Sequence, residues 1–216
     1  FQPVKWHPSM GPESLDVNYS VQLGGKIIPG VNAYSWNQRK REHKGGVEEV
    51  ILDLDLYIDT SISMPNPIET ISLTVLASFV AVKKAHKKGA NIRATVFSGK
   101  NQSTTTGPTK DLQKIYETIT THYNGGTIFP AKTLIEGTNP RQVLIITDTF
   151  LGNNQETCEA IKKVKTDHSG NNVTIYAISS VTEAEALKNA GAEIIQDTTT
   201  NIFKKVIGKA NEVYNK

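Results

Sequence analysis

The chain has 216 residues, and 38% of them are hydrophobic, which is enough for one sizeable core but too little for two large independent domains. Its 24 Lys and Arg residues against 21 Asp and Glu give a net charge of +3 that is spread over the whole length. This balance lacks the dense basic face that a nucleic-acid-binding domain requires. No apolar run approaches the roughly 20 residues of a membrane span. The single cysteine, Cys158, excludes an internal disulfide and favours a cytoplasmic location.

Residues 1–46 are rich in turn-forming residues and contain only short alternating stretches, such as 16–23 and 31–36. The segment ends in a charged run at 39–44, which is typical of a solvated linker. The sequence therefore predicts an extended or hairpin-forming arm over 1–46 that precedes a single domain over 47–216.

From residue 47 onward, apolar β-branched segments alternate with amphipathic ones. The pattern predicts strands at 49–58, 91–99, 141–148, 172–179 and 192–195 and a short polar edge strand within 102–109. It predicts helices at 67–89, 110–123, around 155–165, between the strands 172–179 and 192–195, and at 200–215. Strands that are separated by helices favour a mostly parallel sheet with helices on both faces, the Rossmann-like, doubly wound α/β class. In such sheets, functional sites form at the carboxyl ends of the central strands.

Oxygen-bearing side chains gather where these strands end. One apolar strand runs into Asp59, Ser61 and Ser63, another runs into Asp148, and a loop with two glycines carries Thr127. With no His or Cys among them, these five side chains suit a hard cation, Mg²⁺ first and Mn²⁺ or Ca²⁺ next. They are the predicted metal ligands.

The spacing of the first three residues supports this interpretation. Asp59, Ser61 and Ser63 alternate, so in a near-extended loop their side chains project to the same side. The alternative is that Asp59 caps a helix and the two serines are ordinary turn residues. The Gly-Gly-Thr loop and the second strand-end aspartate favour the metal site.

Three motifs of the chain resemble the metal-ion-dependent adhesion site of von Willebrand factor A (VWA) domains: Asp59-Thr60-Ser61-Ile62-Ser63, Gly125-Gly126-Thr127 and Thr147-Asp148. The resemblance spans roughly residues 48–214. It implies a six-stranded, mainly parallel sheet with one antiparallel edge strand. It also implies that Asp59, Ser61, Ser63, Thr127 and Asp148 coordinate the metal ion, some of them through water.

Two positions depart from the pattern of the family, because Ile62 and Thr149 stand where its members commonly have glycine. A β-branched residue disfavours positive φ, so we expect the loop at Ile62 to have ordinary backbone angles. Ile62, Met64, Ile128 and Phe129 flank the predicted ligands, and we expect them to form an exposed apolar patch.

Two further acidic residues lie within the first predicted strand of the domain. Asp53 and Asp55 alternate with leucines, although a central strand of this class is usually apolar on both faces. We expect the arm and its arginines to cover them, the alternative being that Asp53 is a solvated strand start.

The resemblance implies a non-enzymatic protein-binding domain, in which the bound cation accepts an Asp or Glu from a partner protein. Intracellular members of the family often act as adaptors for AAA-type ATPases, which makes such an ATPase a candidate partner. Neither nucleic acid nor a membrane is an expected partner.

Other functions remain open at this stage. The stretch Asp53 to Tyr57 is close to the nucleophile loop of haloacid-dehalogenase-like, Mg²⁺-dependent phosphohydrolases, with Asp55 as the nucleophile, but Tyr57 breaks that pattern and Asp55 falls within a strand. No Gly-rich phosphate loop followed by Lys-Ser or Lys-Thr supports nucleotide binding. A purely structural module with this fold is the third alternative.

Overall fold

The computed structural model describes residues 3–5, 34–36, 51–137, 140–148, 151–178 and 184–214. The chain divides into two compact units, Phe1–Glu49 and Val50–Lys216. In the first unit, strand β1 (Pro3–Lys5) pairs antiparallel with strand β2 (Tyr34–Trp36), and Val4 lies opposite Ser35. The strand at 34–36 falls in one of the predicted alternating stretches, and the predicted arm other than residues 3–5 and 34–36 lies outside the described residues.

The second unit is built on a six-stranded sheet with the strand order β5-β4-β3-β6-β7-β8. Its strands are β3 (Asp53–Asp59), β4 (Ile92–Phe97), β5 (Ser103–Thr105), β6 (Arg141–Thr147), β7 (Asn172–Ala177) and β8 (Glu193–Gln196). Every pairing is parallel except that of β4 with the edge strand β5. The predicted fold class, with its antiparallel edge strand, is confirmed.

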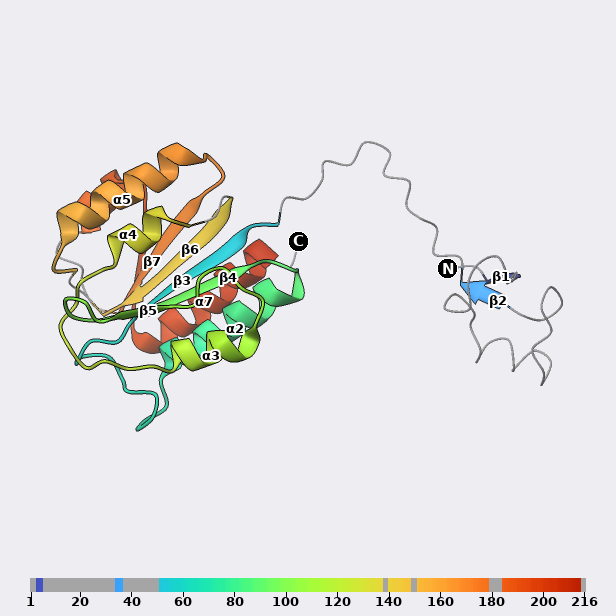
Figure 1. Cartoon of the computed structure of the whole chain (residues 1–216), viewed down its shortest axis with the longest axis horizontal. Coiled ribbons are helices and arrows are strands. Elements are labelled where there is room, and N and C mark those ends of the chain that lie inside the picture. The colour runs from blue at the N-terminus through green and yellow to red at the C-terminus, as the bar shows by residue number, and fades with distance from the viewer. Residues whose placement is uncertain are drawn as a thin grey trace. The chain divides into compact units, whose positions relative to one another are not determined.

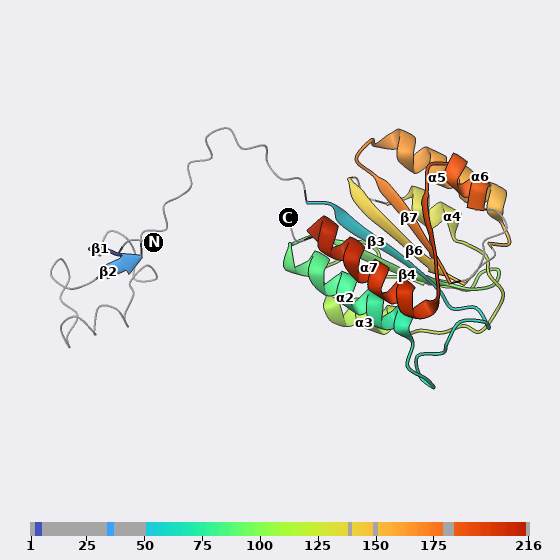
Figure 2. The same ribbon diagram turned by 180° about the vertical axis from the view of Figure 1, so that it is seen from behind.

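Helices cover both faces of this sheet (Figures 1 and 2). One face carries α2 (Leu73–Lys87), α3 (Leu112–Ile119) and α7 (Thr199–Tyr214). The other carries α4 (Ala131–Ile135), α5 (Asn154–Asp167) and α6 (Ala184–Asn189). Leu54, Leu56 and Ile58 of β3 belong to the core under the first set, and Tyr57 belongs to the core under the second. This alternation is the period-two pattern expected of a strand that is buried on both faces.

Helix α2 begins at Leu73, six residues after its predicted start at residue 67. The side chain of Ser72 caps it by accepting a hydrogen bond of 3.4 Å from the Val75 amide. The preceding residues turn around Asn66, whose carbonyl oxygen accepts the Thr70 amide at 3.0 Å. A serine cap and an Asn-centred turn compete with helix here because both satisfy the backbone locally. The short helix α4 was not predicted, since five residues carry too little periodicity to be recognised.

The acidic face of β3 is covered from within the sheet. Asp55 is 1% exposed and forms ion pairs with Arg93 of β4 and with Arg141 of β6, the latter at 3.2 Å. Arg93 also donates to the Tyr57 hydroxyl at 2.8 Å. Burial raises the pKa of the Asp55 carboxyl, and the two guanidinium groups oppose that rise. The expectation that arginines of the arm cover Asp55 is therefore wrong, because the neighbouring strands supply them.

Candidate metal site

The two strand-end aspartates lie at the same edge of the sheet. Asp59 is the last residue of β3, and Asp148 directly follows Thr147, the last residue of β6. The two strands are parallel neighbours, with Ile58 beside Ile146 in the register. Their ends therefore meet at the carboxyl edge, as the sequence predicts for this class of sheet. Asp148 is half-buried and Asp59 is almost fully buried.

Both carboxylate oxygens of Asp59 are held in place. Oδ1 accepts a hydrogen bond of 2.8 Å from the Ser61 amide, and Oδ2 accepts one of 2.7 Å from the Thr147 hydroxyl. Burial raises the pKa of this carboxyl; the two donors oppose the rise, and the negative charge of Asp148 adds to it. A buried carboxylate beside a second carboxylate is a group that a cation would stabilise.

The two serines follow Asp59 on a loop that bridges to a neighbouring segment at Ser61 and then turns, with the Met64 amide donating to the Ser61 carbonyl at 3.0 Å. Ser61 forms an isolated parallel bridge with Gly125, and its hydroxyl lies 3.2 Å from that of Ser63. The intervening Ile62 points away and is 73% exposed. This alternation confirms that the serine side chains share one side. Ile62 has no positive φ, as expected for a β-branched residue.

The Gly-Gly-Thr loop lies against this first loop. The carbonyl oxygen of Gly125 accepts the Ile62 amide at 3.0 Å, and the amide of Asn124 donates to the Thr60 carbonyl at 3.0 Å. A Cβ at Gly125 would lie 2.1 Å from Oε1 of Gln102 and 3.0 Å from Oγ of Ser98, so a larger residue here would displace the Gln102 side chain. The carbonyl oxygen of Thr127 accepts the Gly152 amide at 2.8 Å, which ties the loop to the segment after β6.

Ser98 was missed as a contributor to this edge. It follows β4 directly, and its hydroxyl accepts the Gly125 amide at 2.9 Å and donates to the Gly126 carbonyl at 3.0 Å. It thereby fixes the glycines that precede Thr127. The rule that located Asp59 and Asp148, a polar residue immediately after a central strand, could have found Ser98 too.

The donors present fit a hard divalent cation. The candidate ligands offer carboxylate and hydroxyl oxygens only, with no imidazole or thiol. Across the parts of the chain that the structure describes, no group of three or more His, Cys, Asp or Glu side chains could hold a metal ion. A cation at this edge would therefore depend on hydroxyl ligands as well as on the two aspartates. The assignment of Asp59, Ser61, Ser63, Thr127 and Asp148 as ligands stays a prediction.

The expected apolar patch beside the site is half correct. Ile62 and Ile128 are exposed, at 73% and 37%, but Met64 and Phe129 are only 5% and 1% exposed. The ring of Phe129 packs 5.1 Å from that of Tyr57 and 5.3 Å from that of Phe97. The side chain of Asn153 holds the Phe129 backbone by accepting its amide at 2.9 Å and donating to its carbonyl at 2.8 Å. Phe129 is therefore a core residue. Thr149, the other departure from the family pattern, lies outside the described residues.

No protein-family profile matches the sequence, and no curated protein is similar to it in sequence. Solved structures, in contrast, match the chain closely in fold. The VWA domain of SpRpn10 matches with a TM-score of 0.56 and 10% identity, over 74% of this chain and 95% of that one. The pilus adhesin SpaC of Lactobacillus rhamnosus GG matches with a TM-score of 0.55 and 12% identity, over 77% of this chain. This chain spans only 31% of the adhesin.

A third match is proximal thread matrix protein 1 from the mussel byssus, in a structure whose metal-ion-dependent adhesion site is occupied by zinc. It has a TM-score of 0.51 and 20% identity, over 73% of this chain and 47% of that one. At such identities the likeness establishes the fold. The second unit of this chain has a VWA-like fold.

Proposed function

We propose that this chain, on its VWA-like fold, binds a divalent cation at the carboxyl edge of β3 and β6 and uses it to hold an acidic residue of a partner protein. The observation that carries the proposal is the fixed Asp59 carboxylate beside the Ser61 and Ser63 hydroxyls, which lie 3.2 Å apart. The zinc-occupied site of the mussel protein supports it, because the motifs of this chain resemble that kind of site.

In this function, Asp59, Ser61, Ser63, Thr127 and Asp148 would hold the cation, directly or through water. The cation supplies positive charge that a carboxylate from outside can neutralise. The chain supplies rigidity: Thr147 and the Ser61 amide orient Asp59, and Ser98 fixes the glycines before Thr127. Preorganised oxygen ligands of this kind lower the cost of ordering the site when the cation binds.

The exposed aliphatic residues on the two site loops give the partner a second contact. Ile62 and Ile128 flank the candidate ligands, and their side chains are 73% and 37% exposed. Apolar residues next to a charged contact are a common composition of binding surfaces. A partner segment with an acidic residue and neighbouring aliphatic residues would fit both features. An AAA-type ATPase as partner and a cytoplasmic location stay predictions; across the described residues, no helix combines the length and apolarity of a membrane span.

Titration calorimetry with MnCl₂ tests the metal site. We expect the parent chain to bind one Mn²⁺ and Asp148→Ala to bind none. Asp167→Ala, which removes an exposed carboxylate at the end of α5, is the matched control and should bind like the parent. Unchanged binding by Asp148→Ala would show that this edge is not the metal site.

Affinity purification with and without a chelator tests the partner. We expect a protein that is retained from a lysate in Mg²⁺ to be lost in chelator and with Asp148→Ala. Ile62→Ser should weaken retention with Mn²⁺ affinity unchanged, because Ile62 points away from the ligands. If the partner protein is retained equally with and without chelator, and equally by the Asp148→Ala variant, the result would favour a purely structural module.

The phosphohydrolase alternative has little support in the structure. Its nucleophile would be Asp55, which is 1% exposed and ion-paired with Arg93 and Arg141. A phosphate ester cannot reach a carboxylate that is enclosed in this way. We propose that the chain is not an enzyme.

A further inference from the structure

A second charged feature lies away from the candidate metal site, at the end of α2. This helix ends with four lysines within six residues: Lys83, Lys84, Lys87 and Lys88. At helical spacing they form two like-charged pairs one turn apart, Lys83 with Lys87 and Lys84 with Lys88. Such pairs repel each other. The negative end of the helix dipole favours cations in the last turn, but it does not require four of them on one face.

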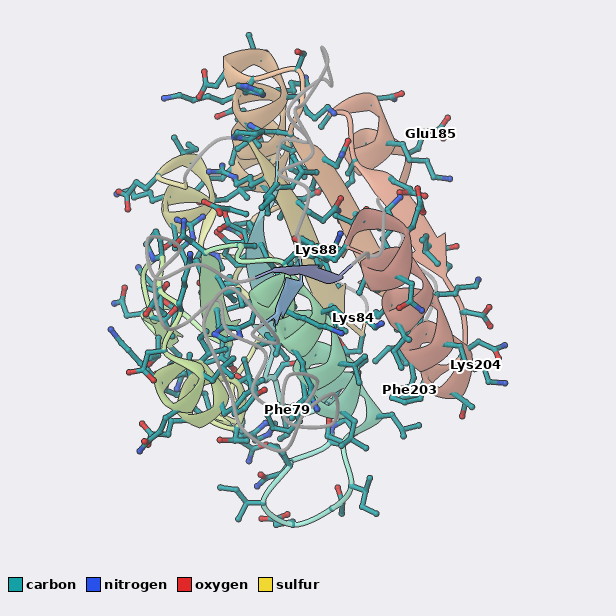
Figure 3. The ribbon with its side chains drawn as sticks, turned by 90° about the vertical axis from the view of Figure 1, so that its right-hand side faces the viewer. Phe79, Lys84, Lys88, Glu185, Phe203 and Lys204 are labelled. Carbon is teal, nitrogen blue, oxygen red and sulfur yellow. The ribbon has the colours of Figure 1, made fainter. Side chains whose placement is uncertain are left out.

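The lysines surround a cavity. About 470 Å³ of space is lined by the four lysines together with Val80 of α2 and Tyr214, the last residue of α7. Helix α2 packs along α7, and Figure 3 shows Lys84 and Lys88 on α2 beside the helix that carries Phe203 and Lys204. Val80 and Tyr214 contribute apolar atoms to the lining, and the lysines complete it. A volume of this order accommodates a large side chain or a small ligand.

Three of the four lysines have no ionic partner among the described residues. Among the described residues, Lys83, Lys84 and Lys87 make no ion pair. The acidic residues nearby have other contacts: the Asp53 carboxylate accepts the Asn91 amide at 2.8 Å, and Glu212 lies 3.6 Å from Lys209. An external anion could therefore pair with Lys83, Lys84 or Lys87 without displacing an ionic partner among the described residues.

We infer that this cavity, bounded by α2 and the end of α7, is a docking site for an acidic peptide segment with one large apolar residue. Glutamates or aspartates of the segment would pair with the lysines, and its apolar residue would enter the cavity against Val80 and Tyr214. The lysine side chain is flexible and ends in a single point charge. It therefore suits carboxylates at variable positions better than recognition of one anion through two fixed hydrogen bonds. The site is distinct from the metal edge, since it involves none of the predicted ligands.

Charge and shape together favour a peptide over other polyanions. A nucleic-acid duplex typically engages about 6–10 phosphates along an extended basic face, and this cluster is a single patch on a chain of net charge +3. An anionic bilayer is flat and would gain nothing from a concave apolar cavity. A peptide uses both the lysines and the cavity.

The test uses the full chain and a fluorescein-labelled probe, a short peptide of glutamates around a central tryptophan, measured by fluorescence anisotropy in chelator. The chelator keeps the metal edge out of the measurement, so the outcome is independent of the proposed function. We expect the parent chain to bind the probe, and the same peptide with glycine at its centre to bind less tightly. Binding should also weaken as the salt concentration rises.

Charge reversal locates the site. Lys83→Glu combined with Lys87→Glu should weaken binding about tenfold or more, because both attractive charges become repulsive. Lys162→Glu combined with Lys163→Glu, an equal charge change at exposed positions of α5, should leave it unchanged. The four substituted residues, Lys83, Lys87, Lys162 and Lys163, are all exposed, so each variant should fold. Thermal melts check this.

Four results would overturn the inference. The first is that the parent chain does not bind the probe, and the second is that the α2 and α5 variants lose affinity equally. The third is equal affinity for the tryptophan and glycine peptides. The fourth is displacement of the probe by a DNA duplex or by phosphatidylserine vesicles at a lower concentration than by unlabelled peptide. The last result would assign the lysines to nucleic acid or to a membrane surface.

Discussion

Thr147, the last residue of β6, donates a hydrogen bond of 2.7 Å to Oδ2 of Asp59, the last residue of β3. This bond joins the ends of two neighbouring parallel strands through a buried carboxylate. The bond orients Asp59, one predicted metal ligand, and its donor Thr147 directly precedes Asp148, another predicted ligand. Thr147 is therefore expected to influence metal affinity without coordinating the cation.

Thr147→Val should lower the affinity for Mn²⁺ about 10–100-fold, the usual effect of removing a group that orients a metal ligand. The substitution keeps the shape of the side chain and removes only its hydroxyl. Thr174→Val is a matched control, because Thr174 is equally buried on the adjacent strand β7 and far from the predicted ligands in sequence. Calorimetry on both variants checks the prediction, and equal Mn²⁺ affinities would remove Thr147 from the site.

Phe129→Ala should destabilise the fold by about 3–5 kcal/mol, as expected when a fully buried phenylalanine is truncated. The lost contacts are those with the rings of Tyr57 and Phe97. Ile128→Ala, its neighbour at 37% exposure, should change stability by only about 0.5 kcal/mol. Urea unfolding followed by far-UV circular dichroism compares the two. A Phe129→Ala protein as stable as the Ile128→Ala protein would contradict the assignment of Phe129 to the core.

Asp55→Ala should lower the free energy of unfolding by about 3–5 kcal/mol, because it leaves two buried guanidinium groups without their carboxylate. Asp53→Ala removes a partly exposed carboxylate from the same strand face and should cost less, about 1 kcal/mol. Chemical denaturation of both variants gives the comparison. Equal losses would mean that the Asp55 ion pairs contribute no more than a surface contact.

A generic phosphatase screen with Mg²⁺ should detect no turnover. The physical reason is that Asp55, the nucleophile of that alternative, is 1% exposed and ion-paired with Arg93 and Arg141. The decisive comparison is between the parent chain and Asp55→Asn. Metal-dependent turnover that is present in the first and absent in the second would restore the phosphohydrolase interpretation.

The strands were predictable because their apolar, β-branched runs are buried on both faces of the sheet and end at polar residues. The strand end at Thr147 agrees with the prediction, and the positions of Asp59 and Asp148 at one edge follow from parallel pairing alone. The two serine hydroxyls lie 3.2 Å apart as expected, but a turn rather than an extended loop brings them together, because the Met64 amide donates to the Ser61 carbonyl at 3.0 Å.

The wrong expectations for Phe129 and Asp55 have a common physical origin in contacts between segments that are distant in sequence. The sequence around Phe129 does not show that its side chain is buried, because its partners Tyr57 and Phe97 lie on strands β3 and β4, far from it in the sequence. The cover of Asp55 by Arg93 and Arg141 depends in the same way on the strand order. The prediction that Ile62 is exposed is confirmed, because its side chain is 73% exposed.

The two edges of the sheet are much shorter than its centre. Edge strand β5 has 3 residues and edge strand β8 has 4, while the central strands β3 and β6 have 7 each. A foreign strand that added to either edge could form only a few backbone hydrogen bonds. The residues of β5 are also serine and threonine rather than aliphatic. The domain can therefore be concentrated, or displayed at high local density, with little tendency to polymerise through its sheet.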